Sequence, residues 1–94
     1  MARYVVERDF GRIGEDEMQE VAAQMEQVNL EQFPDIVWER SHVCADADEA
    51  ITSLCVYTAP SAERLREHAD RVGGHVVARI HEVVADLTPE GVRE

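Results

Sequence analysis

The fold of this chain is decided by the stretch from Leu54 to Val84, which reads LCVYTAPSAERLREHADRVGGHVVARIHEVV. It begins with a run typical of a strand, and Pro60 ends that run because proline cannot donate to a ladder hydrogen bond. Ser61 can cap a helix, and apolar residues then recur at spacings of three and four. The glycines at 73–74 end the helix, and residues 78–84 read as another strand. The stretch therefore predicts a strand, a helix and a strand in succession.

The first half of the chain carries a similar order of elements. Residues 3–8 are aromatic and β-branched at their centre and predict a strand. An acidic cluster then precedes an apolar stripe of helical period over residues 18–28. Residues 36–44 and 51–57 predict two strands, and the short acidic connection between them implies an antiparallel hairpin. The order β-α-β-β-α-β predicts a ferredoxin-like α+β fold, in which a four-stranded antiparallel sheet has two helices on one face.

Length and charge limit the classes of protein that this chain can represent. Its 94 residues predict one domain over residues 1–94, with residues 88–94 as a loose tail. Twenty acidic against nine basic residues leave a net charge of −11, which repels nucleic acid and anionic membrane surfaces. No apolar run approaches the ~20 residues of a membrane helix. We expect a cytoplasmic protein with two reduced cysteines and with neither a nucleic-acid nor a membrane partner.

The third predicted strand is apolar on both of its faces. Leu54 and Val56 point to one side, while Ile51, Cys55 and Tyr57 point to the other, since strand side chains alternate. Two helices can cover only one face of a four-stranded sheet, and soluble monomers rarely leave a large apolar patch exposed. We therefore expect a homodimer that buries the open face of the sheet.

The four histidines are the strongest candidates for chemistry. His68 lies on the flank of the apolar stripe of the second helix and is expected to be half-buried, and His75 follows the double glycine. His81 points away from the helices if Ile80 points toward them. His42 projects from the same strand face as the cysteine two residues later. Imidazole and thiolate are ligands for nickel, zinc and copper, so this set is compatible with a transition-metal site.

Other motifs are missing or incomplete. The chain has no nucleophile motif, no phosphate-binding glycine loop and no C-x-x-C. The acidic turn at residues 45–49 lacks the central glycine and the distal glutamate of a calcium loop, and we interpret it as a solvated turn.

Several segments share a pattern with one known family. They are Arg3–Arg8 (RYVVER), Trp38–Val43 (WERSHV), Tyr57–Glu63 (YTAPSAE), Arg66–Ala69 (REHA), a glycine at 73 or 74, and Arg79–Val83 (RIHEV). With these segments the chain resembles the small nickel-binding ferredoxin-like proteins that are otherwise classed as a domain of unknown function. The resemblance implies a dimer with its sheets face to face and, for some members, nickel binding. It places Cys55, His68, His75 and His81 where nickel-binding members carry Cys or His, whereas residues 7–9 stand where those members place a histidine.

The favoured hypothesis is a cytoplasmic homodimer that binds a divalent transition metal, nickel first by resemblance, for sequestration or sensing. The candidate ligands are His68, His75, His81, His42, Cys55 and Glu82. An alternative is a cofactor-free dimeric α/β-barrel enzyme, a monooxygenase or isomerase, acting on a small apolar molecule in a cleft between sheet and helices. Its acid–base candidates are His68, Tyr57 and His42. A third alternative is a module that binds a partner without chemistry.

Overall fold

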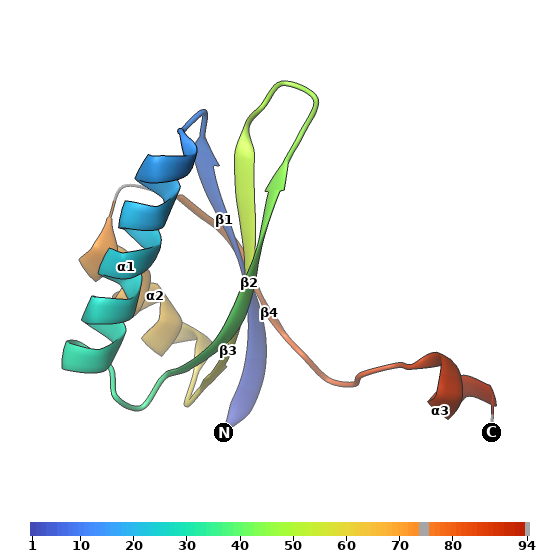
Figure 1. Ribbon diagram of the computed structural model, residues 1–94. Coiled ribbons are helices and arrows are strands. Elements are labelled where there is room, and N and C mark those ends of the chain that lie inside the picture. Colours follow the sequence, from blue (N-terminus) through green and yellow to red (C-terminus); the bar gives the residue numbers. More distant parts are fainter. Residues whose placement is uncertain (74–75, 94) are drawn as a thin grey trace.

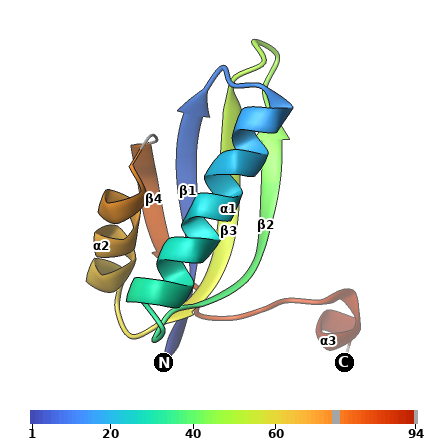
Figure 2. The ribbon, with the colours of Figure 1, turned by 60° about the vertical axis from the view of Figure 1, so that its left-hand side comes forward.

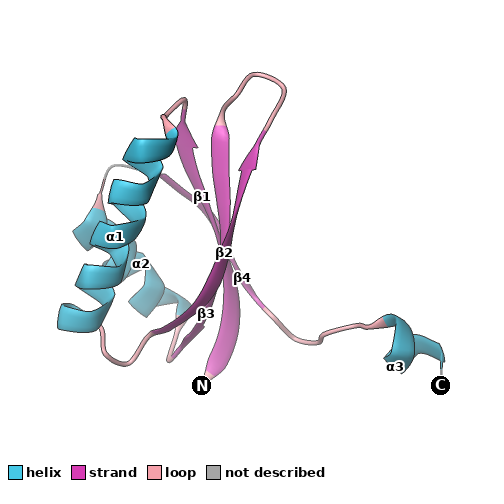
Figure 3. Cartoon of the chain, in the orientation of Figure 1, coloured by secondary structure: helices cyan, strands magenta, loops and turns pink. Residues whose placement is uncertain are grey.

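The computed structural model describes residues 1–73 and 76–93, and its elements follow the predicted order (Figure 1). They are β1 (Ala2–Gly11), α1 (Glu15–Gln32), β2 (Val37–Ala45), β3 (Ile51–Ala59), α2 (Ala62–Val72), β4 (Val76–Glu82) and the short α3 (Pro89–Arg93). The four strands form one antiparallel sheet in the order β2-β3-β1-β4. Helices α1 and α2 lie side by side on one face of this sheet (Figures 2 and 3). The predicted ferredoxin-like fold is confirmed.

The core lies between the sheet and these two helices. Every second residue is buried from Tyr4 to Phe10 in β1 and from Ser53 to Ala59 in β3, as the alternation of a strand requires. Phe33 and Leu65 from the helical layer pack against this face. The apolar stripe predicted on α1 also faces inward, with Met25 at its centre.

The ends of α2 form as the sequence predicted. The Ser61 hydroxyl oxygen accepts a hydrogen bond of 3.2 Å from the backbone N–H of Arg64, which satisfies one free donor of the first turn. Gly73 ends the helix with φ of +68°, in the left-handed region that glycine enters without a Cβ penalty. Gly74, the second glycine of that prediction, lies outside the described residues.

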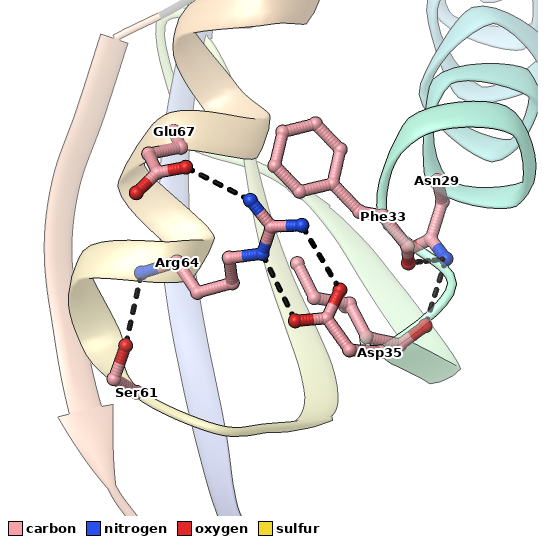
Figure 4. A network of polar contacts seen from close by, with 7 residues as sticks. Asn29, Phe33, Asp35, Ser61, Arg64 and Glu67 are labelled. Atoms are coloured by element: carbon pink, nitrogen blue, oxygen red, sulfur yellow. Dashed lines mark hydrogen bonds and ion pairs between the residues drawn. The ribbon is translucent and has the colours of Figure 1, made fainter.

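Polar contacts tie the loop after α1 to the neighbouring helix (Figure 4). Arg64 donates to both carboxylate oxygens of Asp35, at 2.9 and 3.2 Å, and its guanidinium lies 4.3 Å from the centroid of the Phe33 ring. The hydrogen bonds from Arg64 hold the pKa of the Asp35 carboxyl below its ordinary value. From the last turns of α1, the buried Asn29 amide donates to the loop carbonyl oxygens of Phe33 at 3.3 Å and Ile36 at 2.8 Å. These contacts set the path of the chain from α1 into β2.

After β4 the chain leaves the sheet as an arm, defined as residues 84–93. The sequence predicted a strand as far as residue 84, but β4 ends at Glu82, and the backbone N–H of Val83 makes a 2.8 Å bond to Arg3. Arg3 also forms an ion pair with Asp86 at the base of the arm. The arm extends on the side of the sheet opposite to the helices (Figure 1).

Among the described residues, no helix is long and apolar enough to cross a membrane.

We predict that Asn29→Ala lowers the free energy of unfolding by about 1–3 kcal/mol, because it removes the donor that both loop carbonyls share. Urea denaturation followed by circular dichroism measures this change. Gln27→Ala is the matched control, since Gln27 is exposed on the same helix and its loss should cost no more than about 0.5 kcal/mol. Equal effects of the two substitutions would contradict the structural role of Asn29.

Candidate metal centre on the open sheet face

The face of the sheet opposite to the helices, called the open face, carries four rows of side chains. Read in the order β2, β3, β1 and β4, the rows are Val37–Thr58–Arg3–Val83, Arg40–Val56–Val5–His81, His42–Leu54–Glu7–Arg79 and Cys44–Thr52–Asp9–Val76. The centre of this face is apolar, with Val5, Leu54 and Val56 adjacent to one another. The sequence left open which apolar face of β3 is uncovered. The structure buries Cys55 and Tyr57 under the helices and leaves Leu54 and Val56 on the open face.

One imidazole and one carboxylate meet on the open face. His81 Nε2 lies 2.9 Å from Glu7 Oε1, across the pairing of β4 with β1, and His81 is half-exposed. A carboxylate only accepts hydrogen bonds, so the ring donates through Nε2–H and a neutral His81 presents the lone pair of Nδ1. Such an imidazole, held by a carboxylate in one tautomer, is a common arrangement among metal ligands.

His42 and Cys44 project from the open face of the edge strand β2, as the sequence predicted for this pair, and both are exposed. Strand β3 separates them from β1, so two inter-strand spacings, about 10 Å, lie between the strands that carry His42 and Glu7. The apolar side chain of Leu54 stands between His42 and Glu7 in their row.

Other predicted ligands lie on the opposite face. His68 is fully buried rather than half-buried, because α2 turns it into the core, where its Nε2 lies 3.2 Å from the carbonyl oxygen of Met25. Cys55 is also buried, beside the hydroxyl of Ser53 at 3.3 Å. Glu82 pairs with the buried Tyr4 and so belongs to the helix side of the sheet.

His75 lies outside the described residues. Within the ranges 1–73 and 76–93, no three histidines, cysteines or acidic residues gather closely enough to hold an ion. The sheet thus divides the predicted ligand set, and His81 and His42 are its members on the open face.

The acid–base residues of the alternative enzyme are likewise divided. Tyr57 and His68 are neighbours in the core, with ring centroids 6.0 Å apart, whereas His42 lies on the other side of the sheet. Burial raises the pKa of the Tyr57 phenol, and Arg8, which donates to the phenol oxygen at 3.2 Å, opposes that rise. The phenol therefore stays protonated at neutral pH and is a poor general base.

Two residues of these sites escaped the sequence analysis. Glu7 was noted only as a departure from the family pattern, and its contact with His81 spans 74 positions of the chain. The available signal was the alternation of side chains along the strand, since Glu7 follows Val5 by two residues and therefore lies on the same face. Arg8 is fully buried. Arginine is almost never fully buried unless it is paired, so the residue type gave no reason to place Arg8 in the core.

The two thiols are separated by the same geometry. Cys44 is exposed on the open face and Cys55 is buried on the helix side, so their side chains point away from each other and cannot form a disulfide.

These observations define a class of protein: a two-layer ferredoxin-like domain with a partly exposed carboxylate–imidazole pair on its uncovered sheet face. A family model described as "Nickel responsive protein SCO4226-like" matches residues 4–83, and the chain belongs to this family. The family suggested by the sequence segments is therefore confirmed, and the arm follows the matched range.

Solved structures support the fold. The crystal structure of SCO4226 from Streptomyces coelicolor A3(2) is 24% identical with a TM-score of 0.70, covering 92% of this chain and 100% of that one. The solution structure of the C-terminal domain of the MgtC protein from Mycobacterium tuberculosis is 15% identical with a TM-score of 0.55, covering 87% and 86%. No curated protein sequence matches the chain. At these identities the likeness shows the fold alone.

We predict that His68→Ala lowers the free energy of unfolding of the metal-free protein by about 2–4 kcal/mol, because it opens a cavity beside Phe33 and Tyr57. His81→Ala should change it by no more than about 0.5 kcal/mol, since a half-exposed hydrogen bond between surface side chains contributes little. Urea denaturation of both variants measures the difference. A reversal of this order would contradict the assignment of His68 to the core and of His81 to the surface.

Proposed function

We propose that the protein is a homodimer that binds a divalent transition metal ion, nickel in the first instance, and sequesters or senses it. The observation that carries the proposal is the His81–Glu7 pair, exposed on the open face of a member of a nickel responsive family. The pair supplies one imidazole nitrogen, a ligand of first-row transition metals, and the Glu7 carboxylate holds the ring in the tautomer that presents it.

A second copy of the chain supplies what one chain lacks. The apolar centre formed by Val5, Leu54 and Val56 is self-complementary under two-fold symmetry, so one patch can cover itself. Sheets packed face to face lie about 10 Å apart, and side chains from both sheets fill the space between them. His42 of a second copy is then the second ligand, with the thiol of Cys44 beside it on the same strand.

The chemistry of these donors favours the later first-row ions. Imidazole and thiolate suit nickel, copper and zinc, whereas magnesium prefers oxygen ligands and retains its water. The net charge of −11 raises the local concentration of any cation around the protein, but it does not discriminate between ions. Selectivity between nickel and copper has to come from geometry or metal supply, because copper precedes nickel in the Irving–Williams order.

We predict that the untagged, chelator-treated protein binds one nickel ion per chain, since each chain carries one His81–Glu7 pair. His81→Ala and His42→Ala should each weaken binding at least about tenfold, and Glu7→Gln about tenfold, as losses of ligands and their supports do. Because protons compete for imidazole, whose reference pKa is about 6.5, affinity should fall more than about tenfold between about pH 7.5 and pH 5.5. Isothermal titration measures all of these changes.

Glu82→Gln is the matched control for these variants. It removes a carboxylate next to His81 in sequence but on the helix side of the sheet, so binding should not change. If the wild type and all the variants bind nickel equally, weakly and without dependence on pH, the acidic surface alone holds the ion and the proposed site is wrong.

We predict that the full chain forms a dimer, with a mass twice the 10.6 kDa of one chain in size-exclusion chromatography with light scattering. Val56→Asp should dissociate it, because a carboxylate at the centre of the open face would be buried without a partner. Gln24→Glu adds the same charge on the exposed side of α1 and should leave the dimer intact. A mass of one chain at micromolar concentration would contradict the homodimer.

A further inference from the structure

We propose that the arm of each copy packs into a groove at the β2 edge of the second copy. This inference rests on the homodimer proposed above and goes beyond it, because residues 84–93 follow the family match to residues 4–83. The groove, called the edge groove, lies between the C-terminal half of α1 and β2. It is lined by Glu26, Asn29, Leu30, Pro34, Ile36, Val37 and Trp38.

The arm presents apolar side chains that its own chain leaves in solvent. Val84, Leu87 and Val92 are 89%, 85% and 69% exposed. The ion pair of Arg3 with Asp86 holds the base of the arm in place, while residues beyond it extend away from the body of the subunit (Figure 1). Three exposed apolar side chains within nine residues form a surface that is stabilised by burial against a partner.

The edge groove is apolar and exposed in the same way. Leu30, Val37 and Trp38 are 68%, 51% and 37% exposed and lie along one hollow of the surface.

The rows of the open face place the two surfaces opposite each other. Val83, from which the arm continues, and Val37, on the rim of the groove, are the two ends of one row. One possible two-fold axis runs parallel to the strands, midway between two stacked sheets. Rotation about this axis leaves each row at the same position along the strands and reverses the order of the strands. It therefore brings Val83 of one copy over Val37 of the second. The same rotation brings His81 within one row of the second copy's His42.

The arm is long enough to reach the groove. It leaves the sheet on the side where the second copy would lie (Figure 1). Residues 83–88 precede α3 and can span about 20 Å at ~3.3 Å per residue, twice the ~10 Å between packed sheets. The arm can thus pass the β2 edge of the second copy and enter the groove on its helix side.

The other two-fold arrangement suits the arm less well. An axis perpendicular to the strands would set β4 over β4 and bring the arm toward the hollow at Val76 and Val77 of the second copy. That hollow is lined also by the charged Arg66 and Asp70, so it offers the three apolar side chains less burial than the edge groove.

Cross-linking between differently substituted chains tests the proposal. In a Cys44→Ser background, Leu87→Cys chains are mixed with Leu30→Cys chains and oxidised mildly. We expect a disulfide-linked species of twice 10.6 kDa on a non-reducing denaturing gel in the mixture and in neither single variant alone. As the control, Leu87→Cys chains mixed with Glu63→Cys chains should stay unlinked, since Glu63 is exposed on α2, away from the groove.

The proposal would be overturned if Leu87→Cys chains linked to Val76→Cys chains and not to Leu30→Cys chains. It would also be overturned if a chain carrying both Leu30→Cys and Leu87→Cys formed the disulfide only within itself. A variant ending at Val83 tests the same contact without cysteines. Its dimer dissociation constant should rise at least about tenfold, because the apolar area of the arm is no longer buried. At protein concentrations above that dissociation constant, the number of nickel ions bound per dimer should be unchanged, because the proposed ligands lie within residues 1–83.

An unchanged dissociation constant would overturn the role of the arm and leave the proposed metal-binding dimer standing. A full-length chain that stays monomeric would overturn both.

Discussion

The structure depends on one constraint: side chains alternate along a strand, and two helices cover only one face of a four-stranded sheet. Strands β1 and β3 lie at the centre of the sheet and carry apolar residues toward both sides. On the helix side, Val6 and Tyr57 are buried within the subunit. On the open side, Val5, Leu54 and Val56 have no cover from their own helices, so this face presents a surface suited to a second sheet.

The same alternation sorts the titratable residues by role. His68 faces the core, where an aromatic shell and a backbone carbonyl engage its ring, and it contributes to stability there. His81 faces outward, where a carboxylate orients its ring and solvent reaches it. Arg8 follows Glu7 directly in sequence, yet it is buried against the Tyr57 phenol while Glu7 lies on the open face. Neighbours in sequence therefore serve different parts of the molecule.

The edges of the sheet pose a separate problem, because unpaired strand edges invite uncontrolled association. Strand β2 is one edge and is exposed along most of its length, and β4, which continues into the arm, is the other. A symmetric pair in which the arm of each copy covers the β2 edge of the other would use the same chain segment to protect an edge and to bury apolar side chains. Metal binding between the two sheets would then be linked to assembly, since the proposed ligands would come from both copies.

Local signals in the sequence determined the elements and their order. Ser61 caps α2 and Gly73 ends it because capping and the left-handed conformation depend on a few adjacent residues, and the strand alternation of β1 and β3 is equally local. Tertiary structure alone decided which apolar face of β3 is covered, that His68 is fully buried, and that His81 meets Glu7. The burial of His68 depends on how α2 packs against α1 and the sheet. The other two outcomes depend on strand register, which shifts between Glu7 and Arg8 where β1 pairs with β4 and between Trp38 and Arg40 where β2 pairs with β3. A one-residue shift moves every later side chain to the other face, and its energy comes from contacts between residues far apart in the chain, which no local pattern records.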